Sequence, residues 1–208
     1  MLLKLCAESR NGVLYEMRII AGSARGIPLT VPKTVTRPTA DRTREALFSI
    51  LSGKLEDAQV LDLYAGSGAL GLEALSRGAA AAVFVEQNRT AAGVIEKNAT
   101  KAKLVDRAKI KTIDVAKFLK YPQRDRFDLI FADPPYKKQE SDTDHAAALL
   151  GSAGLAKMLA DDGIFVPEEW SGRVLGSDSS LEELGWEQIE SRSHGAASLH
   201  FFQRLAQA

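Results

Sequence analysis

The chain has 208 residues, of which 45% are apolar and 26% are charged, a composition ordinary for one compact soluble domain. The single cysteine, Cys6, excludes an internal disulfide framework and a multi-cysteine metal site, so we expect a reducing, cytoplasmic setting and no metal. No apolar run approaches the roughly 18 residues of a membrane span, and the first residues are too weakly apolar for a secretory signal. No membrane role is implied.

The formal net charge of zero conceals two segments of opposite sign. Residues 17–44 hold six basic residues and one acid, a balance of +5, whereas residues 139–190 hold two basic residues and twelve acids, a balance of −10. Such a separation favours one face that attracts a polyanion and another that repels it. An unevenly charged, solvated surface is the simpler alternative.

The elements are predicted in chain order from periodicity and turn residues. Residues 1–16 precede the first patterned segment and are interpreted as an N-terminal extension. Residues 17–54 predict a small basic β-hairpin around the turn GSARG, a proline-marked connector, and a first helix that begins near Thr39 or Asp41 and ends at Gly53. Strands and helices then alternate, with strands expected at 60–64, 82–86, 108–114, 127–133 and 163–169, helices at 69–77, 89–102 and about 146–159, and a hairpin that turns at 194–196.

Repeated strand and helix units with near-continuous apolar strands predict an α/β domain over residues 55–208. Its expected fold is a Rossmann-like, mostly parallel sheet with helices on both faces. Ligands of such sheets bind outside the carboxyl ends of the strands. We therefore expect the chemistry at four strand ends, namely Tyr64 to Gly68, Glu86, Asp114, and Asp133 to Tyr136.

The glycine spacing G-x-G-x-x-G occurs at Gly66, Gly68 and Gly71 and opens a helix, which favours close approach of a ligand to the backbone. Alone this signal is weak, because nicotinamide and flavin enzymes share it, and Glu86 would suit ribose hydroxyls in any of them. Asp62 is more distinctive, because a carboxylate inside an apolar strand needs partners. Those partners are either a cationic amino-acid moiety or the glycine loop itself.

Three further polar residues are less specific. Asp114 follows a strand, where its carboxylate could accept a hydrogen bond from an adenine amino group, cap the helix that begins at Val115, or do both. Asn98 is interpreted as a polar helix residue, and His145 as an exposed residue at the start of a helix.

The stretch IFADPPYKK, residues 130–138, runs from an apolar strand into an acid, two prolines and an aromatic residue. The prolines remove two backbone donors and stiffen the loop, so its carbonyl groups are left for another partner. The Asp133 carboxylate and the Pro134 carbonyl could accept from both N–H groups of a planar exocyclic amine on guanine or adenine, while Tyr136 stacks on the base. A tight strand exit is the structural alternative.

The segments VLDLYAGSGALG, FVEQN and FADPPY, in this order, resemble the amino-methylating class I S-adenosylmethionine methyltransferases. The front part, from MRIIAGSARGIPLTVP to TRPTADRTREALFSIL, together with GALGLEALSRGA, resembles the RsmD-type bacterial enzymes, which methylate N2 of one guanine in 16S ribosomal RNA. The resemblance covers about residues 17–204. It implies a seven-stranded sheet, S-adenosylmethionine as cofactor, S-adenosylhomocysteine as product, and ribosomal RNA within the small subunit as the partner of a monomeric enzyme.

The resemblance also implies roles for individual residues. Cofactor contacts are expected from Asp62, Tyr64, Ala65, Gly66, Ser67 and Gly68 at the methionine part, from Glu86 at the ribose and from Asp114 at the adenine, and target-base contacts from Asp133, Pro134, Pro135 and Tyr136. From their charge, Arg25, Arg37, Arg42 and Arg44 are expected to contact RNA. The chain differs from the RsmD-type enzymes at one point. Near their C-terminus those enzymes usually have a turn similar to Tyr-Gly-Asp-Thr, whereas this chain reads SHGAAS, with His194 before Gly195.

Three other functions compete with RNA methylation. Amino-methyltransferases that act on DNA adenine N6 or protein glutamine N5 share the cofactor loop, but Asp133 in place of Asn and the +5 segment favour a guanine in nucleic acid. A nicotinamide-dependent oxidoreductase would leave the Asp-Pro-Pro-Tyr segment unexplained. A noncatalytic RNA-binding module would bind RNA without cofactor.

Overall fold

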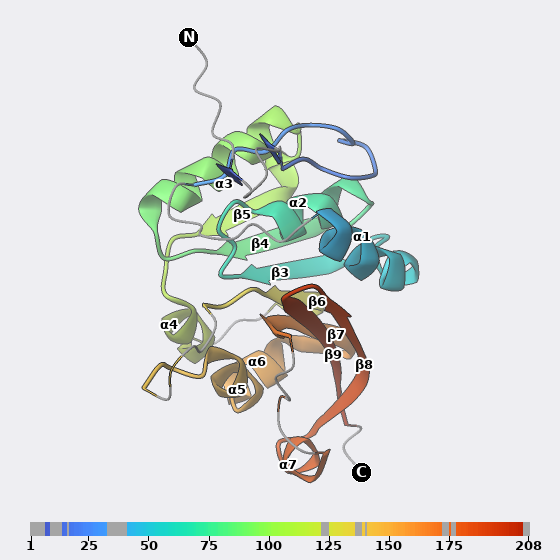
Figure 1. Ribbon diagram of the computed structural model, residues 1–208, viewed down its shortest axis with the longest axis vertical. Coiled ribbons are helices and arrows are strands. Elements are labelled where there is room, and N and C mark those ends of the chain that lie inside the picture. The colour runs from blue at the N-terminus through green and yellow to red at the C-terminus, as the bar shows by residue number, and fades with distance from the viewer. Residues whose placement is uncertain are drawn as a thin grey trace.

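In a computed structural model the protein forms a seven-stranded α/β sheet, as predicted (Figure 1). The structure describes residues 7–8, 14–15, 17–32, 41–121, 125–135, 139, 141–171, 175 and 178–205. Among them, no helix is both long and apolar enough to cross a membrane. The main-sheet strands are β3 (Gln59–Leu63), β4 (Ala81–Val85), β5 (Ala108–Lys111), β6 (Phe127–Ala132), β7 (Leu159–Trp170), β8 (Trp186–His194) and β9 (Ala197–Arg204).

The strand order is β5-β4-β3-β6-β7-β9-β8, which can be followed across Figure 1. Neighbouring strands from β5 to β7 pair in parallel, whereas β9 is antiparallel to both β7 and β8. Consequently β8 runs in the same direction as β3 to β7, and the turn at Gly195 and Ala196 lies at the edge where the parallel strands end. That edge, the carboxyl edge, is where the sequence places the chemistry.

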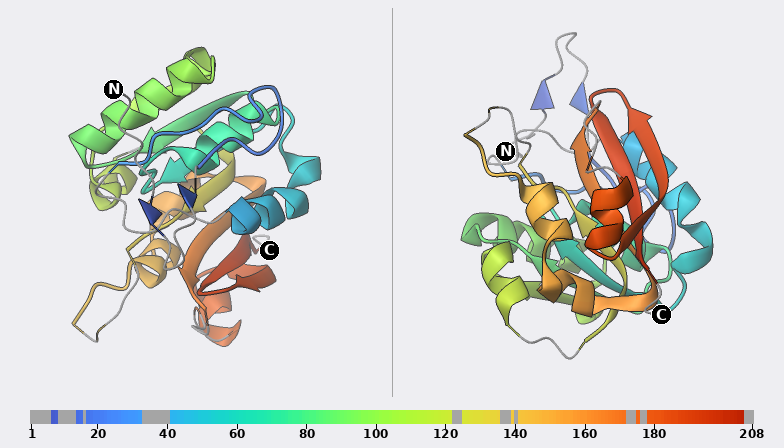
Figure 2. Two further views of the ribbon diagram at one scale, coloured as in Figure 1. Left: turned by 45° about the horizontal axis from the view of Figure 1, so that its top comes forward. Right: turned by 90° about the horizontal axis from the view of Figure 1, so that it is seen from below.

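Helices cover both faces of the sheet and enclose two apolar cores. On one face, here called the α1 face, α1 (Asp41–Ile50), α2 (Ala69–Ser76) and α3 (Arg89–Lys101) pack against apolar residues that include Phe131, Val166 and Phe201. The opposite face holds residues of α4 (Val115–Lys120), α5 (His145–Leu150), α6 (Ala153–Met158) and α7 (Asp178–Glu183). Figure 2 shows α1 beside the β8–β9 hairpin.

Several predicted boundaries needed correction. The helix expected over about 146–159 is two helices, because the chain turns at Gly151 and the Ser152 side chain caps α6 by accepting from the Leu155 N–H. Helix α1 ends at Ile50, and Gly53 belongs to a separate 3₁₀ turn, Ser52–Lys54. A second 3₁₀ turn, Val105–Arg107, precedes β5. Helix α7 and the short pair β1 (Ala7–Glu8) and β2 (Leu14–Tyr15) were not predicted.

The hairpin expected at residues 17–31 does not form two strands. Hydrogen bonds join its arms, for example from the Ile19 N–H to the Ile27 carbonyl, but only the Arg18–Pro28 bridge qualifies as strand pairing. The backbone instead bonds to the helices beneath it: Ile20 and Ala21 donate to the Glu73 carboxylate. The segment therefore behaves as a strap over α2 and α3, and its buried apolar residues, Met17, Ile19, Ala24 and Leu29, join the core of the α1 face.

Candidate active site

The ends of four strands, β3, β4, β5 and β6, meet at the carboxyl edge and are joined by backbone hydrogen bonds. The Ala65 N–H donates to the Val85 carbonyl, the Glu86 N–H donates to the Lys111 carbonyl, and the Asp133 N–H approaches the Leu63 carbonyl at 3.5 Å. The segments after β3, β4, β5 and β6 thus form one continuous rim. Of the predicted residues, Asp62, the Tyr64–Gly68 loop, Glu86, Asp114, Asp133, Pro134 and Pro135 lie along it, whereas Tyr136 lies outside the described residues.

The glycine loop turns sharply between β3 and α2. Tyr64, Gly66 and Gly68 have φ angles of 58°, 53° and 77°, and this left-handed conformation favours glycine. A Cβ atom built on Gly71 would lie 2.3 Å from Cε1 of the Phe84 ring, so α2 packs on β4 more closely than any side chain permits. Ala65 and Ser67 are buried within this turn. Close approach of a ligand to this backbone, which the glycine spacing favours, stays a prediction.

The carboxylates of Asp62 and Glu86 accept hydrogen bonds from backbone N–H groups of the glycine motif. Asp62 is buried at the end of β3 and accepts from the Gly71 N–H at 2.9 Å. The half-buried Glu86 accepts from the Gly66 N–H at 2.9 Å and from the Asn88 N–H at 2.8 Å. The structural alternative for Asp62, that it fixes its own loop, is therefore confirmed, and Glu86 has a structural role in addition to any contact with ribose.

The electrostatics of this rim favour a cation. Burial raises the pKa of Asp62 to about 7, against the lowering effect of the Gly71 hydrogen bond, and the nearby Glu86 charge raises it further. Burial also raises the pKa of Tyr64 to about 12, with a smaller contribution from the charge of Asp114. A positively charged group beside Asp62 and Glu86 would relieve this repulsion. The residues present therefore fit the ammonium and sulfonium charges of S-adenosylmethionine.

Asp114 and His145 take up partly different positions from those expected. Asp114 caps α4 by accepting from the Lys117 N–H at 2.9 Å, which confirms the capping alternative and leaves adenine contact as a prediction. His145 does begin α5, but it is half buried: its Nδ1 lies 3.4 Å from the Tyr64 hydroxyl and the two rings meet edge to face. This contact ties α5 to the glycine loop.

Asn98 positions the loop in a way that its sequence context did not indicate. It is buried in α3, and its Nδ2 donates to the carbonyls of Ser67 and Thr30, each at 2.9 Å, while its Oδ1 accepts from the Thr30 N–H. One amide side chain thus joins the strap to the glycine loop. The available signal was its place on the apolar stripe of α3, with Ile95 and Ala99.

Glu73 is a second positioning residue that the sequence interpretation missed. It is fully buried in α2, where it accepts from Arg77 Nε at 2.6 Å as well as from the strap, and its Oε2 lies 4.0 Å from NH1 of Arg44. A carboxylate inside the otherwise apolar run of ALGLEALS was the available signal, because buried charges need partners. Glu73 anchors both the strap and α1 to the helix that carries the loop.

The expected RNA contact of Arg44 is wrong for this structure. Its side chain has 0% exposed surface, and NH2 donates to Asp41 Oδ1 at 2.6 Å and to the Arg18 carbonyl at 2.8 Å. Arg42 is exposed in the first turn of α1. Arg25 is also exposed, but it lies in the strap turn that bonds to Ser76 at the far end of α2, away from the carboxyl edge. Arg37 lies outside the described residues.

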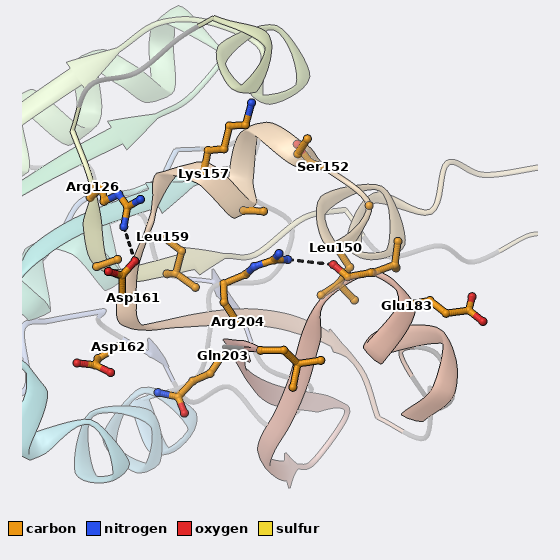
Figure 3. Close-up of a pocket in the computed structure, with 16 residues that line it drawn as sticks. Arg126, Leu150, Ser152, Lys157, Leu159, Asp161, Asp162, Glu183, Gln203 and Arg204 are labelled. Carbon is orange, nitrogen blue, oxygen red and sulfur yellow. Dashed lines mark hydrogen bonds and ion pairs between the residues drawn. The ribbon is translucent and has the colours of Figure 1, made fainter. Parts of the chain in front are cut away.

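A separate cavity of about 850 Å³ lies at the opposite edge of the sheet, between the start of β7, the end of β9 and helices α5 and α6 (Figure 3). Arg126 pairs there with Asp161, and the Arg204 guanidinium lies over the Trp186 ring and donates to the Leu184 carbonyl. None of the predicted site residues that the structure describes lines this cavity. The candidate active site is therefore the rim at the carboxyl edge.

A mostly parallel sheet in which the antiparallel β9 lies between β7 and the edge strand β8, with a glycine loop after β3, defines the class I methyltransferase fold. The family described as "Conserved hypothetical protein 95" matches residues 17–203, so the chain belongs to this family. YlbH of Bacillus subtilis, which carries the provisional name of an rRNA methyltransferase, is 37% identical over 155 residues, 73% of this chain and 82% of that protein.

Two further comparisons agree. Ribosomal RNA small subunit methyltransferase D of Escherichia coli strain K12 is 42% identical over 124 residues, 59% of this chain and 62% of that protein. The solved structure of yhhF from Escherichia coli, provisionally named a methyltransferase, matches with a TM-score of 0.73 and 34% identity over 93% of this chain and all of that chain. The resemblance to RsmD-type enzymes is thereby confirmed.

Proposed function

We propose that this protein transfers a methyl group from S-adenosylmethionine to the exocyclic N2 amine of a guanine in 16S ribosomal RNA of the small subunit. The observation that carries the proposal is the position of Asp133. It follows β6, the strand beside β3, so the Asp-Pro-Pro segment borders the cofactor-type glycine loop. The names of the relatives support ribosomal RNA as substrate, and the acid at position 133 supports guanine.

The chain's residues act mainly by positioning. When bound, S-adenosylmethionine supplies the methyl group on a sulfonium sulfur. The Asp133 carboxylate and the Pro134 carbonyl accept from the two N–H groups of the target amine, which localises the nitrogen lone pair and aims it at the methyl carbon. As the nitrogen–carbon bond forms, the methyl–sulfur bond breaks, S-adenosylhomocysteine is the leaving group, and the amine loses one proton to solvent. Pro134 is buried and Pro135 exposed, so the segment is anchored at one side and open at the other. Orientation of this kind can supply roughly 7–11 kcal/mol of barrier reduction.

A second basic segment, in addition to residues 17–44, supports RNA as the partner. Residues 89–120, which include α3, β5 and α4, hold nine basic residues and three acids, a balance of +6. Many of these side chains are exposed: Arg89, Lys97, Lys101, Lys103, Lys109, Lys117 and Lys120. Basic charge therefore gathers toward the β5 end of the sheet and acidic charge toward the β7–β8 end, which would orient a polyanion relative to the rim.

The direct test is transfer of radiolabelled methyl to 16S ribosomal RNA and to small ribosomal subunits from cells that lack the enzyme. The proposal expects incorporation into one of these substrates and none into adenine-containing DNA or a glutamine-containing peptide. Incorporation into DNA or peptide alone would favour the competing amino-methyltransferases. A nucleotide-dependent absorbance change without methyl transfer would favour an oxidoreductase.

Cofactor binding should weaken below about pH 7. Because the pKa of Asp62 is about 7 in the free protein, its carboxyl must lose a proton before it can pair with the cofactor's ammonium group. Affinity should fall by up to about tenfold per pH unit below that pKa and level off above it. Calorimetry in buffers of different ionisation enthalpy measures the released proton.

The Asp62→Asn variant is the matched control, since it keeps an acceptor for Gly71 but cannot titrate. The cofactor affinity of this variant should not change near pH 7.

The raised pKa of Asp62 also affects folding stability, because the folded free protein binds this proton more tightly than the unfolded chain, in which the pKa is near 3.8. The stabilisation by the protonated group is complete below that value and is lost as pH rises through about 7. If cofactor affinity depended on pH in the same way in wild type and in Asp62→Asn, the role assigned to Asp62 would be contradicted.

Glu86→Ala should weaken cofactor affinity by roughly 1.5–3 kcal/mol, the range for hydrogen bonds to a charged group. The loss combines ribose contact with release of the Gly66 and Asn88 N–H groups. Glu86→Gln retains an acceptor for the loop and should lose less. Titration calorimetry with a thermal melt separates these effects, and unchanged affinity in folded Glu86→Ala would exclude contact with the cofactor.

Replacing Arg25, Arg37 and Arg42 by alanine should flatten the salt dependence of RNA affinity. Each lost phosphate contact reduces the slope of log affinity against log salt by roughly 0.7–0.9. Cofactor affinity should stay close to normal. Lys157→Ala is a suitable control, because this exposed lysine lies on α6 within the acidic half of the chain. Parallel slopes for wild type and the triple variant would show that the segment is only a solvated surface.

A further inference from the structure

Trp170 stands out among the exposed apolar residues because of its place at the carboxyl edge. It is the last residue of β7, and 46% of its surface is exposed. The only other tryptophan, Trp186, is completely buried at the start of β8. A large indole ring thus remains half exposed one strand away from the Asp-Pro-Pro segment.

Strand register places Trp170 on the same face of the sheet as Asp133. Phe131 of β6 is paired with Val166 of β7, and both lie in the core of the α1 face. Because side chains alternate along a strand, Asp133 and Trp170 continue that face beyond these two residues. With strands about 4.8 Å apart and a rise of about 3.3 Å per residue, the two Cα atoms are separated by roughly 8 Å.

The C-terminal hairpin extends this row. Trp170 is paired with Ala197 of β9, and Ala197 with His194 of β8, so the three side chains share the α1 face. The Ser171 N–H donates to the Ala196 carbonyl at 2.9 Å, which fixes the end of β7 against the turn. Ala197 is small, so the ring of Trp170 is bordered on this side by a methyl group. The Trp170 side chain therefore lies on a framework of three paired strands.

The cofactor-type residues lie on the other side of Asp133. Asp62, Glu86 and Asp114 follow or end β3, β4 and β5, whereas β7, β9 and β8 lie beyond β6 in the opposite direction. A target amine held at Asp133 must face the cofactor on the β3 side, so the base of a flanking nucleotide can lie over the end of the neighbouring strand β7 while the phosphate backbone continues toward the basic β5 end. Aromatic rings in such a position stack on bases without needing a particular base identity.

We propose that Trp170 stacks on a nucleobase that flanks the target guanine and so holds the RNA strand in register with Asp133. The inference rests on the proposed function, and it adds a substrate-binding residue on β7. The separation of roughly 8 Å from Asp133 places the ring beside a neighbouring nucleotide of a splayed strand rather than beside the target base itself.

Kinetics give the first test. Trp170→Ala should raise KM for 16S ribosomal RNA or the small subunit on the order of tenfold or more, while the affinity for S-adenosylhomocysteine stays within about twofold. Trp170→Phe keeps an aromatic plane and should recover most of the loss. Tyr121→Ala is the matched control: this residue, 61% exposed at the far end of α4, should leave KM unchanged.

Fluorescence gives a readout that a purely structural role would not affect. Because Trp186 is buried, stacking of a base should quench the emission of Trp170 when an unmodified 16S ribosomal RNA transcript is added with S-adenosylhomocysteine. Trp170→Phe should show no such quenching. The inference is overturned if wild type transfers methyl normally yet shows no quenching and Trp170→Ala has an unchanged KM. It is also overturned if Trp170→Ala loses cofactor affinity and thermal stability in parallel with RNA affinity. Failure of wild type to methylate RNA would instead remove the proposed function.

Discussion

Asp133→Ala should reduce turnover on the order of 10²-fold or more and leave cofactor affinity within a few-fold. The proposed acceptor acts on the target amine most strongly in the transition state, so its loss should appear in the rate rather than in cofactor binding. Single-turnover kinetics with labelled cofactor measures the chemical step, and calorimetry measures the affinity. The backbone of residue 133 remains next to β3, so the variant should fold.

Two companion variants make this result specific. Asp133→Asn keeps one side-chain oxygen and should lose less turnover than Asp133→Ala. Asp128→Asn, an exposed position at the other end of the same strand, keeps its acceptor for the Gln59 N–H and should behave as wild type. Near-normal turnover of Asp133→Ala would remove this carboxylate from the mechanism.

Glu73→Ala should lower the free energy of unfolding by roughly 3–5 kcal/mol, the usual cost of breaking a buried ion pair by removing one partner. The substitution leaves the Arg44 guanidinium buried without its nearest carboxylate on α2, and it leaves the Ile20 and Ala21 N–H groups without their acceptor. Urea denaturation measures the change. Because the strap and α1 both rest on this residue, the variant should also expose residues 17–32 to proteolysis.

Glu96→Ala is the control for this prediction, since it removes the same charge from an exposed position on α3 and should change stability by less than about 0.5 kcal/mol. Equal effects of the two substitutions would show that the cluster around Glu73 contributes nothing beyond its charge. If Glu73→Ala lost stability without increased cleavage of the strap, the carboxylate would stabilise the contact between α1 and α2 but would not anchor the strap.

The sheet was predictable because its signals are local. Continuous apolar strands such as FDLIFA and amphipathic helices such as residues 89–101 follow simple periods, and the hairpin turn at Gly195 has the φ of 62° that glycine favours. The strap was not predictable in the same way. Its backbone groups are satisfied by Glu73, Ser76 and Asn98, which lie roughly fifty to seventy positions further along the chain.

The residues of the candidate site likewise fall into those that local sequence signals predict and those that depend on tertiary packing. Glycine spacing and strand ends placed Gly66, Glu86 and Asp133 on one rim, because parallel strands bring their carboxyl ends to one edge. Charge alone misplaced Arg44, whose guanidinium is sequestered by Asp41 and by the Arg18 carbonyl. A count of basic residues does not distinguish a phosphate contact from a buried ion pair, and that distinction depends on tertiary packing.

The most direct test of the proposed function is the identity of the methylated nucleoside. Small ribosomal subunits from cells that lack the enzyme would be incubated with the purified protein and S-adenosylmethionine, and the digested 16S ribosomal RNA would be analysed by mass spectrometry. We expect one equivalent of N2-methylguanosine above the untreated subunits, formed on the order of 10²-fold or more slowly with Asp133→Ala. Methylation of another base, or of another atom of guanine, would contradict the assignment of Asp133 and Pro134 to the guanine amine.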